Sequence, residues 1–461
     1  MPPDMSEVGL LVLSARNFPS LKALLVNAAQ TVKSRLYIRV QGSELDSILP
    51  SLYLQSSIHC PQLDVRVLLG QKIPHYSRLI GDESPQDVSI TRPKYKKVVL
   101  GGTFDRLHNG HKVLLSKAAL LASECVICGV THKAMIEKKS LWELIEPIGK
   151  RMQAVEDFVA DVSDSVVCLA EPIEDPFGPS TRVPDLEAIV VSQETINGGE
   201  AVNRVRKEKN MSHLDMITID LLESIDEVLK ETKISSSSRR RADLGKLLKP
   251  PALHPERPHR PYVIGLCGGI ASGKSNIAKI LREQPGFEVI DCDKLAHSCY
   301  DTGTELIGYI DTHFPGAVKN GVVDRKVLGQ AVFGDEVKMK KLCNLVWPVL
   351  MKRIEGIVAK SCSDVVVIEA AAIIEAQWHH YLNELWTVFV PHDEMVRRVM
   401  ERDQLPREQA ENRIRSQLTN KERLEHSNVV FCSLWAYEET RSQVDRALKD
   451  LRSRLSQHEP T

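Results

Sequence analysis

An apolar run at 262–267 is followed at once by a glycine-rich turn and then by a helical stretch. The turn fits the pattern G-x-x-x-x-G-K-[ST], whose backbone N–H groups surround phosphate oxygens while the helix N-terminus adds its positive end. The residues expected to contact ATP are Gly268, Gly269, Ile270, Ala271, Ser272, Gly273, Lys274 and Ser275. Lys274 is expected to act in catalysis on the β and γ phosphates, and the Ser275 hydroxyl to bind Mg²⁺. The alternative is a glycine turn with a chance lysine.

Two carboxylates, Asp291 and Asp293, directly follow the next expected strand, 288–290. Parallel strands end at one edge of their sheet, so these side chains should lie beside the glycine-rich turn. An enzyme that transfers phosphate to a hydroxyl needs an acid there: one carboxylate can take the proton, while the other orders Mg²⁺ waters or the turn. The simpler alternative is an aspartate that caps a turn or a helix.

Arginines recur between 397 and 417 on what the sequence predicts to be two short helices. Such runs are often solvated faces. Kinases of small molecules, however, close a cationic lid over the transferring phosphoryl group, and arginine suits that bidentate contact. Both interpretations remain open from the residues alone.

Residues 262–455 resemble the dephospho-coenzyme A kinases, whose signature is the glycine-rich turn, then D-x-D-x-x-A-H, then an arginine lid that ends in R-x-x-x-Q. The resemblance implies that Asp293 is the general base toward a ribose 3′-hydroxyl and that Asp291 and His297 contact the acceptor. It also implies that the catalytic lid contains Arg402, Arg407 and Arg413. The chain departs from the prokaryotic pattern at Trp347 and Ala371.

A second glycine-containing turn follows the apolar strand expected at 97–100 and leads to His108 and His111 in the pattern H-x-G-H. Two histidines at this place can donate hydrogen bonds to the oxygens of a nucleotide α-phosphate while a second phosphate attacks it, with no covalent nucleophile. The residues expected to contact ATP here are Gly101, Gly102, Thr103, Phe104 and Asp105. Purely structural histidines are the alternative.

The segment 233–241 is rich in serine and arginine, as in a flexible basic linker or a localisation signal. The alternative is a helix start at which hydroxyls and free N–H groups hold the β and γ phosphates of ATP. The residues with that expected role are Ser235, Ser236, Ser237 and Arg240.

Residues 93–248 are similar to the phosphopantetheine adenylyltransferases of eukaryotic and archaeal type, through H-x-G-H, the serine-rich segment, Asp175–Pro179 and 191–206. The resemblance implies a catalytic lysine on the phosphates, with Lys133 favoured over Lys138 and Lys139, and Arg151 as a phosphopantetheine ligand. Further substrate contacts implied in the same way are Ser192, Glu194, Thr195, Asn203 and Arg206.

The length of 461 residues predicts several domains. We expect an α/β protein: a small α/β N-terminal region, 1–92, that carries no catalytic motif; a Rossmann-like nucleotidyltransferase domain, 93–248; a proline-rich linker, 249–261; and a P-loop kinase domain, 262–461, each catalytic domain a parallel sheet flanked by helices. The net charge of -1 gives no overall attraction to nucleic acid or anionic lipid. Because no apolar run approaches 20 residues, we expect no transmembrane segment.

The order of the two resemblances is that of animal bifunctional coenzyme A synthases, in which one reaction makes the substrate of the next. This resemblance implies ATP, 4′-phosphopantetheine and dephospho-coenzyme A as partners, Mg²⁺ as cofactor, and a cytoplasmic enzyme with a mitochondrial association. The sequence does not decide the oligomeric state, and a monomer is allowed. Two alternatives stay open: a cytidylyltransferase fused to a nucleoside-type kinase, and a nucleotide-binding scaffold without turnover.

Overall fold

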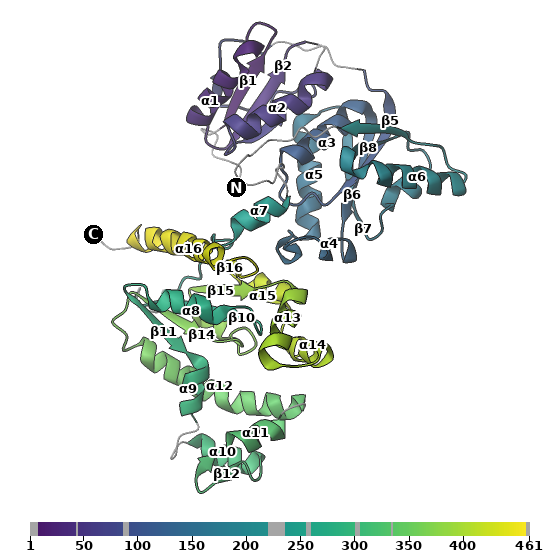
Figure 1. The fold of residues 1–461 in the computed structure, drawn as a ribbon. Coiled ribbons are helices and arrows are strands. Elements are labelled where there is room, and N and C mark those ends of the chain that lie inside the picture. Colours follow the sequence, from purple (N-terminus) through teal and green to yellow (C-terminus); the bar gives the residue numbers. More distant parts are fainter. Residues whose placement is uncertain are drawn as a thin grey trace. The chain divides into compact units, whose positions relative to one another are not determined.

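The computed structural model describes residues 8–42, 45–85, 92–219, 236–254, 260–299, 305–332 and 335–457. The chain divides into two compact units, unit 1 with residues 1–241 and unit 2 with residues 242–461. Figure 1 shows both as layered arrangements of helices and strands. Within the described residues, no helix is both long enough and apolar enough to cross a bilayer.

The N-terminal part of unit 1 is a small parallel sheet in the order β3-β2-β1-β4. Its strands are β1 (Val8–Leu13), β2 (Arg35–Val40), β3 (Asp64–Val67) and β4 (Arg78–Ile80). Helices α1 (Leu21–Thr31) and α2 (Leu45–His59) connect and cover them. The small α/β region expected there is confirmed.

The rest of unit 1 is a five-stranded parallel sheet in the order β7-β6-β5-β8-β9. Its strands are β5 (Tyr95–Gly102), β6 (Ala122–Thr131), β7 (Val167–Ile173), β8 (Ala188–Ser192) and β9 (Asp215–Ile219). Its helices are α3 (Asn109–Leu121), α4 (Ala134–Glu137), α5 (Ile148–Val162), α6 (Ile196–Glu208) and α7 (Ser236–Asp243). The strand order reverses between β5 and β8, so ligands are expected where β5 ends and α3 begins. The predicted Rossmann-like fold is confirmed.

One hydrophobic cluster of unit 1 spans both of its sheets. The same cluster of buried side chains contains Leu36 and Tyr53 from the N-terminal part and Val98, Val113 and Phe158 from the second sheet. The backbone N–H of Leu69 also donates to the carbonyl of Val162, 2.8 Å away. The N-terminal region is therefore packed into the unit that carries the histidine pair.

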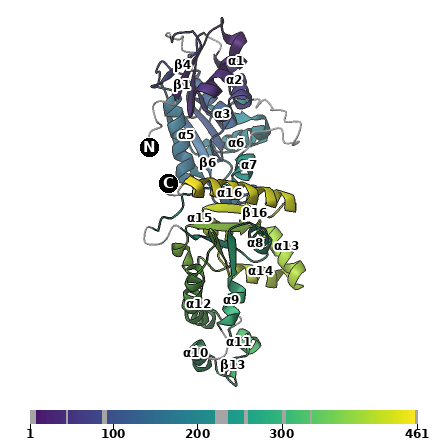
Figure 2. The same cartoon turned by 90° about the vertical axis from the view of Figure 1, so that its left-hand side faces the viewer.

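Unit 2 contains a five-stranded parallel sheet in the order β11-β14-β10-β15-β16. Its strands are β10 (Tyr262–Gly268), β11 (Phe287–Asp291), β14 (Val365–Glu369), β15 (Glu384–Phe389) and β16 (Val429–Cys432). Separate clusters of buried side chains lie on its two faces. The predicted P-loop kinase fold is confirmed (Figure 2).

Helices surround this sheet, and a small helical subdomain extends from it. The helices that follow the sheet strands are α8 (Lys274–Arg282), α9 (Cys292–Ser298), α13 (His392–Asp403), α14 (Arg407–Arg415), α15 (Asn420–His426) and α16 (Tyr437–Gln457). The subdomain holds α10 (Glu305–His313), the short strands β12 (Val318–Lys319) and β13 (Val322–Val323), α11 (Arg325–Val332) and the start of α12 (Glu336–Val358).

The end of the domain predicted at 93–248, as well as the start of the proline-rich linker predicted at 249–261, pairs with residues of the kinase domain. Gly245 N donates to Val430 O at 2.9 Å, Leu247 forms a β-bridge with Val429, and Ala252 N donates to Asn383 O at 2.8 Å. Prolines lack the backbone N–H, but the residues between and before them use theirs to pair with the kinase sheet. Residues 242–254 thus belong to unit 2, while residues 255–259 lie outside the described part.

Candidate functional sites

The glycine-rich turn of unit 2 runs from the end of β10 to the first turn of α8. A Cβ on Gly268 would lie 2.6 Å from Val388 O, and Gly273 has a φ of +84°, so both positions need glycine. The turn is also held from outside, because Ile270 N donates to Gln417 Oε1 at 2.9 Å and Ser433 Oγ donates to Ser272 O at 2.7 Å. The backbone is therefore fixed in place before any phosphate arrives.

A buried carboxylate that the sequence analysis missed faces this turn. Glu369, at the end of β14, is 5% exposed. It accepts hydrogen bonds from Lys274 Nζ at 3.0 Å and Arg282 Nη2 at 2.8 Å, and Ser275 Oγ lies 3.4 Å away. A carboxylate that ends an apolar strand, after Val365–Ile368, was the signal that could have found it. Glu369 holds the predicted lysine and hydroxyl together.

The two aspartates after β11 have different surroundings. Asp291 accepts from Lys294 N at 3.1 Å and forms an ion pair with Lys294 Nζ at the same distance. Burial opposes ionisation of Asp291, but these contacts outweigh it and lower the pKa of its carboxyl group. Asp293 is exposed in the first turn of α9. Asp291 therefore orders the turn, whereas the side chain of Asp293 is open to solvent; the side chain of His297 lies outside the described part.

The predicted lid arginines lie on α13 and α14. Arg402 Nε and Arg413 Nη1 both bind the carboxylate of Asp403, each at 2.8 Å. Arg407 Nε instead binds Glu411 Oε1, on its own helix, at 2.8 Å. All three guanidinium groups are partly solvent-exposed. The structure brings Arg402 and Arg413 to one anion and keeps Arg407 apart from them.

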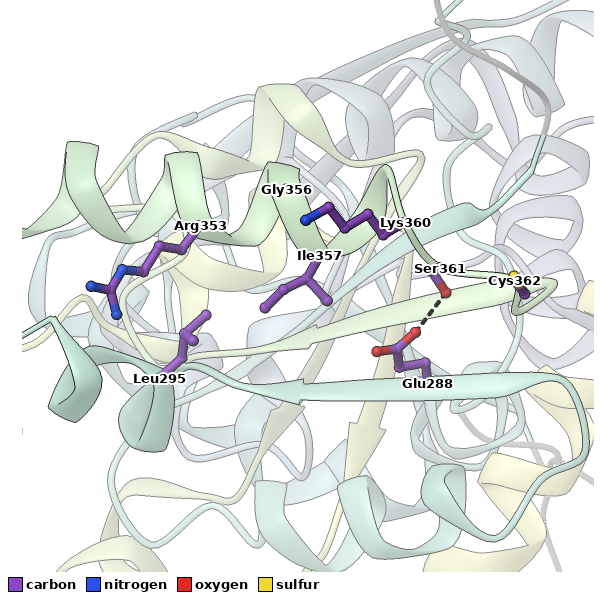
Figure 3. A pocket seen from close by; sticks show the side chains of 8 residues that line it. All are labelled: Glu288, Leu295, Arg353, Gly356, Ile357, Lys360, Ser361 and Cys362. Carbon is purple, nitrogen blue, oxygen red and sulfur yellow. Dashed lines mark hydrogen bonds between the residues drawn. The ribbon is translucent and has the colours of Figure 1, made fainter.

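A cavity of about 550 Å³ lies elsewhere in unit 2, between β11, α9, α12 and the turn after α12 (Figure 3). Its polar lining includes Arg353, Lys360 and Glu288, and Ser361 Oγ donates to Glu288 Oε2 at 2.5 Å. The lining contains no residue of the glycine-rich turn. This cavity is separate from the phosphate site.

In unit 1 the histidine pair lies where β5 gives way to α3. His108 is the N-cap of α3, and its ring stacks on that of His111 with a centroid distance of 3.8 Å and an interplanar angle of 25°. Burial, together with nearby positive charge, lowers the pKa of His108 to about 2 and that of His111 to about 3. Both imidazoles are thus neutral near pH 7, and each can donate one N–H to a phosphate oxygen.

The serine-rich segment lies against this pair. Ser236 Oγ donates to Asp105 O at 3.1 Å and is 3.4 Å from His108 Nε2. Ser236 therefore lies beside His108, and α7 begins at Ser236. Ser237 accepts from Arg240 Nη2 at 3.0 Å. Ile234 and Ser235 lie outside the described residues.

Arg240 and Asp105, both predicted to contact ATP, instead bind each other in the interior. Arg240 Nη1 is 2.6 Å from Asp105 Oδ2, and the two side chains are 1% and 0% exposed. Arg240 also donates through Nε and Nη2 to Ser140 O. A guanidinium used in this way is not available to a phosphate. The neighbouring Arg239 is the arginine whose charge lowers the pKa of both histidines.

The surroundings of Lys133, the lysine favoured from the sequence, also differ from the expectation. The Lys133 ammonium group forms an ion pair with Glu174 at 2.7 Å, and its side chain is 64% exposed. Lys139 lies closer to the histidines: its positive charge contributes to the lowered pKa of His111. Burial, then Arg240 and Arg151, lowers the pKa of Lys139 itself. Of the three lysines considered from the sequence, Lys139 is the one that the structure brings toward the histidines.

The turn before the histidines is shaped by its own residues. Phe104 adopts a φ of +49°, and its buried ring lies 5.2 Å from that of His111. A Cβ on Gly102 would come within 2.9 Å of that ring, while Gly101 is exposed at the strand end. Thr103 Oγ1 accepts from Thr131 Oγ1 at 3.1 Å. Gly101, Gly102 and Thr103 thus border the site, and Phe104 supports His111.

Most residues predicted to contact phosphopantetheine hold the backbone instead. Arg151 donates to Glu146 O, Thr103 O and Thr131 O at 2.7–2.9 Å. Arg206 donates to carbonyls that include Ser180 O and Val183 O, and Asn203 pairs with the backbone of Leu214. Ser192 and Thr195 cap each other, and the exposed Glu194 lies in the same short helix. A buried arginine needs several acceptors, and here backbone carbonyls supply them.

The fold and the two phosphate-binding turns define a chain with two nucleotide-dependent transferase units. A family model described as dephospho-CoA kinase matches residues 262–433, and one described as cytidylyltransferase-like matches residues 99–242.

Three relatives agree with these matches. The chain is 34% identical to a dephospho-CoA kinase of Carboxydothermus hydrogenoformans, over 40% of this chain and 90% of that one. It is 42% identical to a phosphopantetheine adenylyltransferase of Pyrococcus furiosus, over 29% and 82%. It is 37% identical to a phosphopantetheine adenylyltransferase of Saccharomyces cerevisiae, over 38% of this chain but only 56% of the yeast one. The chain belongs to the phosphopantetheine adenylyltransferase family and to the dephospho-CoA kinase family, combined in one polypeptide.

Proposed function

We propose that the chain carries out two consecutive reactions. Unit 1 transfers the adenylyl group of ATP to 4′-phosphopantetheine and releases pyrophosphate, which gives dephospho-coenzyme A. Unit 2 then phosphorylates the ribose 3′-hydroxyl of dephospho-coenzyme A with a second ATP, which gives coenzyme A and ADP. The observation that carries the proposal is membership of both families in one chain, because the product of the first reaction is the substrate of the second.

In the first reaction, a phosphate oxygen of 4′-phosphopantetheine attacks the α-phosphorus of ATP and pyrophosphate leaves. The neutral rings of His108 and His111 donate hydrogen bonds to the oxygens on which negative charge grows. Arg239 and Lys139 supply positive charge beside the rings. Catalysis here consists of holding two phosphates in line and stabilising charge, so it needs no nucleophile from the protein.

In the second reaction, the N–H groups of the glycine-rich turn bind the phosphates of ATP and Lys274 reaches the transferring group. To reach them, the ammonium group of Lys274 must leave the carboxylate of Glu369 and bind the phosphates instead. Asp293 accepts the proton of the 3′-hydroxyl as that oxygen attacks the γ-phosphorus. Arg402 and Arg413 lie together on Asp403, where a phosphate could replace that carboxylate as their partner.

The residues of unit 2 also fit a magnesium ion. Ser275 and Glu369 place a hydroxyl and a carboxylate oxygen beside Lys274, and Mg²⁺ prefers such oxygen ligands. When bound, the ion would neutralise charge on the β and γ phosphates. Ser275 would be its direct ligand, with Glu369 holding its waters.

A cytidylyltransferase is the nearest alternative for unit 1, since the matching family model carries that description. The relatives named as adenylyltransferases favour ATP instead. Comparing ATP with CTP in the first reaction separates the two. A scaffold without turnover is disfavoured by the phosphate-binding turn and its Lys274–Glu369 pair.

The two reactions should be separable by single substitutions. His111→Ala removes a donor from the first transition state and should slow that reaction about 10²- to 10³-fold. The same protein should still convert added dephospho-coenzyme A at the parent rate. Asp293→Asn keeps the side-chain shape but removes the base, so the second reaction should slow about 10²-fold.

Mass spectrometry of the products from 4′-phosphopantetheine and ATP measures both reactions in one sample. In the Asp293→Asn protein, dephospho-coenzyme A should accumulate. If either substitution stops both reactions in a folded protein, the assignment of two sites is refuted and a single shared nucleotide site is the better explanation.

A further inference from the structure

One face of α3 is held by the N-terminal part of unit 1. Asn109, Lys112 and Ser116 are spaced so that they share one side of a helix, and each contacts an element of the small sheet region. His111, the neighbour of Lys112, belongs to the same first turn. The helix turn that carries a proposed phosphate donor is thus attached to a region without any catalytic motif.

Asn109 provides the first attachment. Its Nδ2 donates to Tyr53 O at 3.0 Å and to Ser57 Oγ at 2.8 Å, both on α2. Asn109 is the residue directly after His108, the N-cap of α3. His108 has no side-chain cap bond to the helix, so the first turn gains its fixed position from α2 instead.

Lys112 provides the second and more deeply buried attachment. The residue is 5% exposed, and its ammonium group donates to Asp64 Oδ1 at 2.5 Å and to Val65 O at 2.8 Å, both on β3. Burial lowers the pKa of Lys112 despite the nearby carboxylate of Asp64. A buried ammonium group tolerates little displacement from its acceptors. The contacts of Lys112 with β3 therefore fix the position of the first turn of α3.

The carboxylate of Asp64 is itself held from its own sheet. Arg35 Nε and Arg66 Nε bind Asp64 Oδ2 at 2.9 Å and 3.0 Å. The same two arginines reach Asp161 on α5, Arg66 at 2.8 Å and Arg35 at 3.5 Å. The anchor for Lys112 is therefore a network that spans β2, β3 and α5, and it does not depend on one flexible pair.

We propose that the N-terminal region is a positioning element of the first active site, and that Asn109 and Lys112 are its positioning residues. They act through the first turn of α3, which places His108 and His111 for the adenylyl transfer. The inference rests on the proposed function of unit 1. It gives residues 8–80 a role that their own sequence did not indicate.

Lys112→Met tests the proposal, with Lys117→Met as a matched control. Lys117 also joins α3 to the N-terminal region, through an ion pair with Asp46 on α2, but it lies on the helix well beyond His111. Both substitutions remove one ammonium group and keep an unbranched side chain. If Lys112 positions the histidines, its loss should lower kcat of the first reaction about 10- to 100-fold. Small displacements of the histidine N–H donors reduce the stabilisation that they give to the transition state.

The Michaelis constants for ATP and 4′-phosphopantetheine should change less than about twofold, and Lys117→Met should leave kcat within about twofold of the parent. The second reaction, measured with added dephospho-coenzyme A, should be unchanged in both. Equal losses of kcat in the two lysine variants, or an unchanged kcat in Lys112→Met, would overturn the proposal.

The parent protein separates the two levels of inference. If the parent makes no dephospho-coenzyme A, the proposed function of unit 1 fails; if the parent is active and Lys112→Met equals it, only the positioning role fails. Should Lys112→Met not fold, Asn109→Ala decides, because Asn109 is only partly buried and loses two hydrogen bonds. It should lower kcat with constant Michaelis constants, and an unchanged kcat would again overturn the role.

Discussion

The buried pair of Arg240 and Asp105 gives the sharpest test of how unit 1 uses its serine-rich segment. Arg240→Ala leaves the Asp105 carboxylate, 0% exposed, without its main cation. Arg106 Nη1 at 3.2 Å and the backbone N–H of Glu146 at 3.0 Å remain as partners. The Ser140 carbonyl oxygen also loses both of the guanidinium N–H groups that donate to it, Arg240 Nε and Nη2.

Removing one partner of a buried ion pair costs about 3–5 kcal/mol of folding stability, because the other charge stays in the interior. Both side chains of the Arg240–Asp105 pair are buried, so the pair meets this condition. Arg240→Lys keeps the charge but loses the forked contacts to Ser140 O, so about 1–2 kcal/mol is expected. Arg204→Ala, on an exposed arginine of α6, serves as the control and should change stability by less than about 0.5 kcal/mol.

Urea unfolding followed by hydrogen-exchange mass spectrometry measures this effect, since it separates peptides of unit 1 from those of unit 2. The expected order of stability is parent, Arg240→Lys, then Arg240→Ala. At low urea, Arg240→Ala protein that remains folded should show an ATP requirement close to the parent value. A stable Arg240→Ala protein with a strongly raised Michaelis constant for ATP would refute the reasoning and make Arg240 a phosphate ligand.

Three further outcomes follow from the contacts described above. Glu369→Gln should slow the second reaction about 10²-fold and spare the first, because the waters of the proposed Mg²⁺ lose the carboxylate that would hold them beside Ser275; a second-reaction rate within twofold of the parent contradicts this. The rings of His108 and His111 should remain neutral down to about pH 5 in imidazole ¹⁵N NMR of the ligand-free protein, and protonation near pH 6.5 would contradict their lowered pKa values. Burial would raise the pKa of Asp64, but the charges of Lys112 and Arg66 bring it down to about 2. The ionised carboxylate therefore stabilises the fold above about pH 4, and this stabilisation is lost as the pH falls toward 2. The stability difference between the parent and Asp64→Asn should therefore be about 1–2 kcal/mol at pH 7, after allowance for the exposed third of the carboxylate, and should shrink at pH 3; a difference that does not depend on pH contradicts the network.

The features that sequence predicted best are those set by neighbours along the chain. The glycines at 268 and 273 are required by a close approach and a positive φ within one turn, so the spacing alone identified the turn. The apolar run at 262–267 likewise predicted β10, and the H-x-G-H pattern placed both histidines at the start of α3. Local chemistry of this kind needs no knowledge of the sheet order.

The features that sequence did not predict depend on partners far away in the chain. Glu369 meets Lys274 only because β14 is inserted beside β10. The family resemblance implies that Arg151 and Arg206 bind substrate, but in the structure they donate to backbone carbonyls from other parts of the chain. Helices α2 and α12 each contain a proline, Pro50 and Pro348, which local propensity disfavours inside a helix.

The shared core of unit 1 also bears on where the protein can be divided. The match to the cytidylyltransferase-like family model begins at residue 99, so a fragment cut there would contain the whole match. Such a fragment would expose the apolar side of α3 and leave the Lys112 ammonium group without Asp64. We expect such a fragment to aggregate, since an uncovered apolar face favours association. The start of the family match and the start of the folding unit therefore lie at different residues in this chain.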